Sequence, residues 1–234
     1  VKDKNSTIKK NIVLAFQNHK KNNFKVAESI YKKILKLNPN HFDSIFLLGS
    51  LLIQTKNFNT AVQLLNKAIQ IKPDHANAYH NLGLVFKVLG KFKDAINCCQ
   101  KAVKYEPKNL ITLYDLSELK KEVLDQNLKN KIKKIMGSKD CTIKNLAYGN
   151  FLLAKYELRG RNYDKEFNYL VKGHQCYFES ERKNFNKGVE YWLNELPKKK
   201  ELFNISKLNI NINEINYKIK PIFIIGFPRC GSTL

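Results

Sequence analysis

Apolar and small residues recur along the first half of the chain with a period of 34 residues. Three prolines mark the period, at Pro39, Pro73 and Pro107. Aligning the chain on these prolines produces columns of leucine, small residues, phenylalanine and alanine: Leu14, Leu48 and Leu82; Ala15, Gly49 and Gly83; Phe24, Phe58 and Phe92; Ala27, Ala61 and Ala95; and Ile34, Ala68 and Ala102. Because these columns hold over three successive units, the period predicts a repeated structural element.

Each unit has the pattern of two helices that pack against each other. Small residues, such as Gly49 and Gly83, let two antiparallel helices approach closely, and each proline ends a second helix because it lacks a backbone N–H donor. The pattern resembles the tetratricopeptide repeat, a stacked helical hairpin. We therefore expect repeats at 8–41, 42–75 and 76–109 with a partial one at 110–121, and helices at about 8–20, 24–37, 42–54, 58–71, 76–88, 92–105 and 110–121.

The period fails after residue 121, so residues 1–121 are predicted to be the repeat domain. In the next unit the alanine column would hold Lys129, which cannot support a close helix approach. For residues 122–197 we expect divergent helical hairpins instead. The stretch from Gly160 to Gly173 echoes the turn and second helix that begin at Gly90, with Glu166 in place of the small alanine. The expected helices are at about 125–137, 143–158, 163–183 and 184–196.

The last part of the chain changes in character. Residues 198–220 are rich in Asn, Ile and Lys, and we interpret them as a linker with some extended character. Residues 221–234 open on a continuous apolar run, which is typical of a strand buried in a parallel sheet. Gly226 and Gly231 follow at the spacing of a loop whose backbone N–H groups hold a phosphate. A nucleotide-triphosphatase loop would carry lysine where this chain has Ser232, which argues against ATP or GTP hydrolysis.

The string PIFIIGFPRCGSTL at 221–234 resembles the 5′-phosphosulfate loop of the sulfotransferase family. Repeats followed by such a loop resemble bacterial repeat–sulfotransferase fusions, which are related to protein-tyrosine sulfotransferases. The resemblance implies 3′-phosphoadenosine 5′-phosphosulfate (PAPS) as co-substrate, and no metal. By position, Arg229 would be the catalytic cation that stabilises charge on the oxygen bridging phosphate and sulfuryl groups. PAPS would be bound by Arg229, Cys230, Gly231, Ser232 and Thr233, where Cys230 departs from the family's usual serine.

The expected fold is thus an all-α superhelix of antiparallel hairpins, followed by a linker and the first strand and P-loop of an α/β sulfotransferase domain. In the resembling repeat family the first helix of each hairpin lines a concave face, which would bind a protein or peptide partner. Two alternatives stay open: a repeat protein that binds partners without catalytic activity, and a repeat module attached to another P-loop enzyme. The side chains expected to line the partner groove are Phe16, His19, Phe46, Ile53, His80 and Lys87.

Composition excludes several function classes. The 234 residues carry 42 Lys and Arg against 20 Asp and Glu, a net charge of +22 that would ordinarily suggest nucleic acid. Only four of the 42 are arginine, the residue best suited to phosphate and base contacts, and the charge is spread along the chain, so we expect no nucleic-acid partner. No stretch approaches the roughly 20 continuous apolar residues of a membrane span, so none is expected.

The cysteines and the chain ends bear on location. The five cysteines form no C-x-x-C pair and leave an odd number, so we expect neither a disulfide framework nor a zinc site, and a reducing compartment, the cytoplasm by default. The chain starts at Val1 and stops at Leu234 inside the phosphate-type loop. We interpret both ends as cut, leave targeting open, and expect the chain as it stands not to be an active enzyme.

Overall fold

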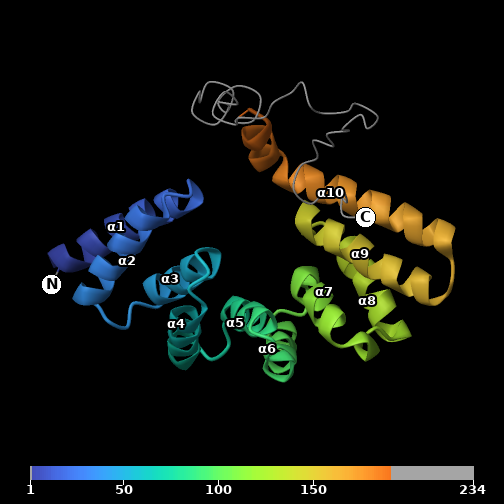
Figure 1. Ribbon diagram of the computed structural model, residues 1–234, viewed down its shortest axis with the longest axis horizontal. Helices are drawn as coiled ribbons and strands as arrows, with labels where there is room; N and C mark the ends of the chain where they lie inside the picture. The colour runs from blue at the N-terminus through green and yellow to red at the C-terminus, as the bar shows by residue number, and fades with distance from the viewer. Residues whose placement is uncertain (1, 191–234) are drawn as a thin grey trace, which may run out of the picture. The chain divides into compact units, whose positions relative to one another are not determined.

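The computed structural model describes residues 2–190, and every element in this range is a helix (Figure 1). The first six helices form three antiparallel pairs, α1 with α2, α3 with α4 and α5 with α6. Helices α2 to α6 begin and end where the repeat pattern predicts. The six are α1 (Lys2–Lys20), α2 (Phe24–Leu37), α3 (Phe42–Gln54), α4 (Phe58–Ile71), α5 (Ala76–Val88) and α6 (Phe92–Tyr105).

The remaining described elements are α7 (Leu110–Leu119), a short 3-10 helix η1 (Lys121–Val123), α8 (Gln126–Met136), α9 (Ile143–Arg159) and α10 (Tyr163–Glu190). Two expectations are wrong. Helix α1 begins at Lys2 rather than near residue 8, and α10 runs unbroken through the predicted boundary between residues 183 and 184. The chain has no proline between Tyr163 and Glu190, so nothing removes a backbone donor there. The predicted linker at 198–220 and the strand and loop at 221–234 lie outside the described residues.

The same turn closes four of the hairpins. Asn22, Lys56, Gly90 and Arg161 all have φ near +60°, with values of 62°, 61°, 72° and 56°. In each turn the next residue donates its backbone N–H to the carbonyl five residues earlier, at 2.9 Å, 2.8 Å, 2.8 Å and 2.9 Å. This is the left-handed helix end of a Schellman motif. The α9–α10 hairpin therefore turns as the three regular repeats do, although its sequence has diverged.

The shared turn gives the register of the last hairpin. Arg161 comes 71 positions after Gly90, which is two periods plus three residues. At the same offset, Leu153 and Ala154 of α9 fill the columns of Leu82 and Gly83, and both are buried. The three additional residues lie between α6 and α9, where α7, η1 and α8 replace a regular hairpin.

Polar side chains start several first helices. The Nδ1 atoms of His41 and His75 accept the backbone N–H of Ser44 at 3.3 Å and of Ala78 at 3.1 Å. Asn109, one period later, accepts the N–H of Thr112 in the same way. Each satisfies an N–H that the helix leaves unpaired, so the residue after each proline turn acts as a helix cap.

Buried side chains form two main clusters. The first comes from α1 to α6 and includes Tyr31, Leu51 and Leu65. The second comes from α7, α8 and α9 and includes Leu110, Ile132 and Leu152, with Val103 of α6 packed against it. Within residues 2–190, no helix combines the length and the apolar character that a membrane crossing needs.

Candidate functional site on the first-helix surface

The first helices α1, α3 and α5 carry the residues that the sequence predicts to hold a partner. Helices α7 and α9 are the first helices that follow them, and we call the surface of all five the first-helix surface. Neighbouring first helices contact each other directly, α1 with α3, α3 with α5, and α7 with α9 (Figure 1). Polar side chains join them. The side-chain amide of Gln54 lies 3.1 Å from Nε2 of His19, and Asn81 Nδ2 donates to Ser50 Oγ at 2.8 Å. These bonds fix the spacing between neighbouring hairpins.

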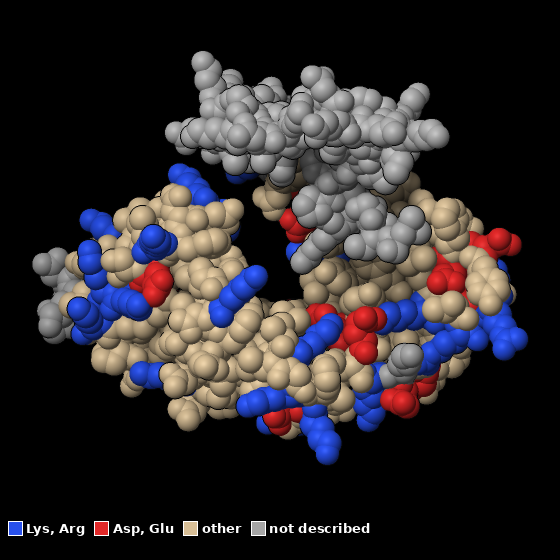
Figure 2. All heavy atoms as spheres, viewed as in Figure 1, with Lys and Arg blue, Asp and Glu red and all other residues tan. Residues whose placement is uncertain are grey.

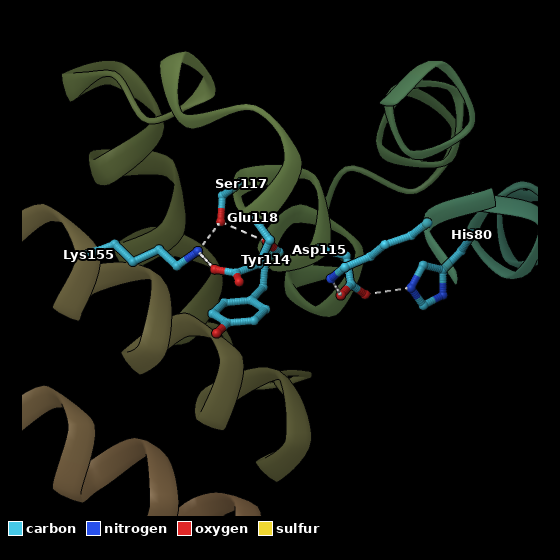
Figure 3. A network of polar contacts seen from close by, with 7 residues as sticks. His80, Tyr114, Asp115, Ser117, Glu118 and Lys155 are labelled. Carbon is cyan, nitrogen blue, oxygen red and sulfur yellow. Dashed lines mark hydrogen bonds and ion pairs between the residues drawn. The ribbon is translucent and has the colours of Figure 1, made fainter. Parts of the chain in front are cut away.

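The Asp115 carboxylate on α7 contacts two side chains from α5, those of His80 and Lys87. His80 Nε2 lies 2.9 Å from Asp115 Oδ2 (Figure 3). Lys87 Nζ lies 3.9 Å from Asp115 Oδ1. The His80 and Asp115 side chains are only 14% and 17% exposed, whereas Lys87 is 38% exposed. The close pair is therefore shielded from water, and Lys87 presents its ammonium at the edge of the pair.

A lysine on α9 makes a second polar group with α7. Lys155 Nζ donates to Ser117 Oγ at 3.0 Å and pairs with the Glu118 carboxylate (Figure 3). The same ammonium stands 4.4 Å from the centre of the Tyr114 ring, a cation–π distance. Ser117 Oγ in turn donates to the Tyr114 carbonyl at 2.7 Å. The hydroxyl is thus engaged as donor and acceptor, which suits a structural role rather than a nucleophile's.

Aromatic rings from three helices lie beside this polar group. The Tyr114 ring meets Tyr148 edge to face at 5.4 Å, and Phe151 lies 5.8 Å from Tyr148. On α10, Tyr177 lies 6.3 Å from Tyr148 and His174 lies 5.0 Å from Phe151. Burial raises the pKa of both the Tyr114 and the Tyr148 phenol. We call these five residues the aromatic cluster. The Tyr114 and Tyr148 phenols therefore stay neutral over the physiological range, and the cluster offers apolar area.

An ion pair near the aromatic cluster joins α9 to α10. Lys144 Nζ donates to Glu181 Oε1 at 2.9 Å, which joins the start of α9 to α10. Burial by itself would lower the pKa of Lys144, but the hydrogen bond and charge of Glu181 outweigh it and raise that pKa. The pair is half-exposed, so it orients the two helices more than it stabilises them.

The structure places the six predicted groove residues in four settings. Phe16 is 40% exposed with the Lys20 ammonium 4.5 Å from its ring centre, and Ile53 is half-buried against the first cluster. Phe46 stacks on Phe42 at 6.1 Å. His19 is buried, so its ring supports the surface from beneath. His80 and Lys87 come together at Asp115, as described above.

Sequence reasoning missed the residues that complete this site: Asp115, Tyr114, Glu118, Lys155, Tyr148, Phe151, His174 and Tyr177. Asp115 falls in the column of Leu47 and Asn81, which gives no hint of a charge. Lys155 can be assigned to a first-helix position only with the 71-residue offset of the α9–α10 hairpin, because the 34-residue period does not continue into α9. The available signal was the Leu153–Ala154 dipeptide, which repeats Leu82–Gly83.

The charge pattern of the described chain is mixed. Basic side chains are spread over the face in Figure 2 with acidic ones among them, including near the first-helix surface. No group of three or more His, Cys, Asp or Glu residues within 2–190 could hold a metal ion. Cys98 and Cys99 are buried, and burial raises the pKa of their thiols to about 11 and about 12. Both therefore stay protonated and serve as packing groups. The predicted loop residues Arg229 to Thr233 lie outside the described range.

Three family models match part of this helical-repeat architecture. Models described as tetratricopeptide repeat match residues 30–63 and 76–109, and one described as TPR repeat matches residues 49–90. Residues 30–109 are therefore tetratricopeptide repeats, and this range includes α3 and α5 of the first-helix surface. The segment 221–234 lies outside all three matches. No curated protein sequence matches the chain.

Solved structures match parts of the chain at low sequence identity. A crystal structure of MamA protein matches with a TM-score of 0.50 and 21% identity, over 76% of this chain and 96% of that one. A Thermobaculum terrenum O-GlcNAc transferase mutant matches with a TM-score of 0.49 and 19% identity, over 67% of this chain and 26% of that one. The first TPR of Spaghetti (RPAP3), bound to an HSP90 peptide, matches with a TM-score of 0.47 and 18% identity, over 50% of this chain and 92% of that one.

Proposed function

We propose that the first-helix surface binds an extended segment of a partner protein. The observation that carries this proposal is the pair of polar groups on α5, α7 and α9, which are fixed by bonds within the chain itself. A surface whose side chains are already ordered loses little entropy when a partner arrives. The aromatic cluster beside them supplies the apolar area that such an interaction requires.

Charge and shape indicate the chemistry of the segment. The Lys87 ammonium has three N–H donors, and its contact with Asp115 is long at 3.9 Å, so donors remain for a partner's carboxylate. Phe16, Phe46 and Ile53 offer apolar contacts on α1 and α3. The surface therefore favours a segment that alternates acidic and apolar side chains.

A binding assay with a matched control tests this proposal. The probe is a labelled peptide that alternates Glu and Leu, and fluorescence polarisation reports its dissociation constant. Lys87→Ala should weaken binding about threefold to tenfold, in line with the loss of one partly exposed charged contact. Lys93→Ala removes an exposed lysine from α6, a second helix, and should leave binding unchanged. Equal affinities for wild type and Lys87→Ala would contradict the assignment.

We also propose that this chain is the N-terminal portion of a PAPS-dependent sulfotransferase. The supporting feature is the order of residues at 221–234: an apolar run, Gly226, Arg229, Gly231 and two hydroxyls, with no lysine at position 232. In such a reaction the sulfuryl group passes from the donor's phosphate to an acceptor hydroxyl oxygen. The acceptor proton goes to a base, and adenosine 3′,5′-bisphosphate leaves. The repeats would hold the acceptor protein or a partner near the reaction.

Turnover by the longest natural form of the protein tests the second proposal. Release of adenosine 3′,5′-bisphosphate from PAPS is measured with a panel of tyrosine-containing peptides as acceptors. Arg229→Ala should cut turnover about a hundredfold, because it removes the cation that would stabilise the negative charge on the bridging oxygen as the bond breaks. Arg182→Ala removes an exposed arginine that pairs with Glu179 on α10, and should have no effect. A wild-type protein that consumes no PAPS would favour the alternative, a repeat protein that only binds partners.

A further inference from the structure

The second helices α2, α4 and α6 share a row of exposed positions that holds no acidic and no apolar side chain. The row has four positions in each helix, at spacings that lie along one side of a helix, and it recurs with the 34-residue period. We call its residues the outer stripe: Lys25, Ser29, Lys32 and Lys36 on α2; Asn59, Gln63, Asn66 and Gln70 on α4; and Lys93, Asn97, Gln100 and Lys104 on α6. Apart from Ser29, every member is a lysine or a carboxamide.

The outer stripe faces away from the buried side of each helix. On α4, the buried Ala61 lies two residues from both Asn59 and Gln63, which at about 100° per residue is nearly the opposite side of the helix. Figure 1 shows α4 and α6 below α3 and α5, so the second helices lie on one side of the regular repeats. Lys67 Nζ of α4 donates to the Pro39 carbonyl at 2.8 Å, which joins the outer sides of the first two hairpins.

Most lysines of the outer stripe have no counter-charge. Within the described residues, only Lys32 of the stripe has an ion pair, with Glu28 at 2.6 Å. Lys32 and Lys36 are four positions apart, a spacing at which like charges on a helix repel each other. Together with Lys25 they line one shallow hollow on α2. The only other acid of the three helices, Asp94, lies off the stripe in the first turn of α6. The stripe therefore carries a positive charge that an external anion can neutralise.

This charge pattern belongs to the second helices rather than to the chain as a whole. The first helices α3, α5 and α7 carry a single lysine and three acids: Lys87, Asp43, Asp115 and Glu118. In α10 the positions that match the α6 part of the stripe hold an acid and an apolar residue among amides: Asp164, Asn168, Val171 and Gln175. A general excess of Lys and Asn would affect all of these helices alike. The segregation therefore reflects the fold.

The side chains of the outer stripe indicate which class of anion fits. A carboxamide offers two N–H donors and a carbonyl acceptor, which match the main chain of a polypeptide, whereas a phosphodiester backbone offers acceptors only. The stripe has no arginine for bidentate phosphate contacts and no aromatic ring for base stacking. It also has no apolar side chain to enter a membrane. An acidic polypeptide satisfies both the lysines and the carboxamides.

We propose that the outer stripe binds an acidic, extended segment of a partner polypeptide. The lysines of α2 and α6 pair with carboxylates of the segment, and the carboxamides of α4 between them hydrogen-bond its main chain. The stripe covers about 16 Å along α2, enough for about five residues of extended chain. This site is separate from the first-helix surface and does not depend on it, so one chain can hold two partners at the same time.

Paired lysine variants test the charges of the stripe. The probe is labelled poly-L-glutamate, and fluorescence polarisation with the 234-residue chain at physiological ionic strength gives the dissociation constant. Lys25→Gln combined with Lys36→Gln should raise this constant about fivefold to twentyfold, because two ammonium groups without counter-charges are lost. Lys165→Gln combined with Lys172→Gln removes the same charge from exposed positions on α10 and should change it by less than about twofold. Circular dichroism melts verify that both variants fold. Equal weakening by the two pairs would overturn the proposal.

A second pair of variants tests the carboxamides. Gln63→Ala combined with Asn66→Ala should weaken binding of poly-L-glutamate about threefold and leave binding of polyacrylate unchanged, because polyacrylate has carboxylates without peptide groups. Equal weakening of both polymers would contradict the assigned main-chain contacts. Polyuridylate and phosphatidylserine vesicles represent the other anions. Tighter binding of either one, lost in the Lys25 and Lys36 variant, would overturn the proposal in favour of nucleic acid or membrane. Lys87→Ala should leave poly-L-glutamate binding unchanged, which separates this site from the first-helix surface.

Discussion

At the scale of single residues, His19 shows how a polar ring is held in a repeat core. The residue is 8% exposed, and its ring meets the edges of Phe24 at 6.0 Å and Tyr31 at 6.2 Å. Its Nδ1 and the Tyr31 hydroxyl are buried without a hydrogen-bond partner in the described chain. Burial lowers the pKa of His19, and the hydrogen bond with Gln54 offsets only part of that effect. The fold therefore favours the neutral ring.

This lowered pKa predicts a loss of stability in mild acid. The unfolded chain takes up a proton near the ordinary pKa of 6.5, whereas folded His19 resists protonation. The stabilisation is present above pH 6.5 and is lost as the pH falls through the lowered folded pKa. His19→Phe removes the titrating group while keeping a ring. Urea unfolding at several pH values between 7 and 5 should thus show a shallower fall in unfolding free energy for His19→Phe than for wild type.

His75 also has a pKa lowered by burial, and the nearby Lys72 adds to the effect, so some acid sensitivity should persist in His19→Phe. Identical pH slopes for wild type and His19→Phe would show that the buried ring does not control this response.

The residues of the site were predictable only in part, and the reason is geometric. His80 and Lys87 occupy positions that the period assigns to the surface of a first helix, so the sequence predicts them as groove residues, and their contact with a partner stays a prediction. Their partner Asp115 lies on the next first helix, and a period specifies which positions face a partner without specifying which side chains meet. Lys155 comes after the irregular α7–α8 region, where three additional residues shift the register. A fixed 34-residue period therefore cannot predict which residues on the two sides of this shift are in contact.

At the scale of helices, close approach of α5 and α6 rests on Gly83. A Cβ at this position would lie 2.9 Å from Cys99 Sγ and 3.4 Å from the Ala95 carbonyl oxygen. Cys99 is 1% exposed, so its thiol has no room to move aside. Gly83→Ala should therefore lower the unfolding free energy by about 1 to 3 kcal/mol through overpacking, although alanine favours helix. Urea denaturation measures the change.

A double-mutant cycle identifies the cause. Cys99→Ala removes the sulfur atom that the new methyl group would meet. If contact with that atom is the source of the cost, Gly83→Ala should cost distinctly less in the Cys99→Ala background than in wild type. Gly49→Ala offers a milder case, because its nearest atom is a Leu65 side-chain carbon at 3.2 Å. Equal costs in both backgrounds would place the destabilisation elsewhere.

Helix boundaries were predictable wherever a local signal ends the helix. A proline follows the ends of α2, α4 and α6, and these ends agree with the sequence expectation. The expected break at residue 184 had no proline behind it, and α10 passes through with Gly188 in its interior. The start of α1 was inferred from the period alone. The backbone continues as helix to Lys2, because a period constrains packed positions and not the residues beyond them.

At the scale of the whole described chain, the hydrophobic core is divided. One cluster joins α1 to α6, and the other joins α7, α8 and α9, with Val103 of α6 reaching into the second. The His80–Asp115 pair crosses between them on the first-helix surface. In repeat arrays each unit contacts only its neighbours, so stability is a sum of local terms rather than one global quantity. Partner binding near Asp115 would therefore stabilise both clusters at the point where they meet.

Because the core is divided, we expect a cavity in one cluster to destabilise mainly the helices of that cluster. Leu65 in the first cluster and Leu152 in the second are both 0% exposed. Either leucine-to-alanine change should lower stability by about 2 to 5 kcal/mol, from lost burial and the cavity left behind. Native-state hydrogen exchange distinguishes where the loss is felt. Leu65→Ala should speed exchange most in α3 to α6, and Leu152→Ala most in α7 to α9. Uniform acceleration throughout residues 2–190 in both variants would instead mean that the two clusters unfold as a single cooperative unit.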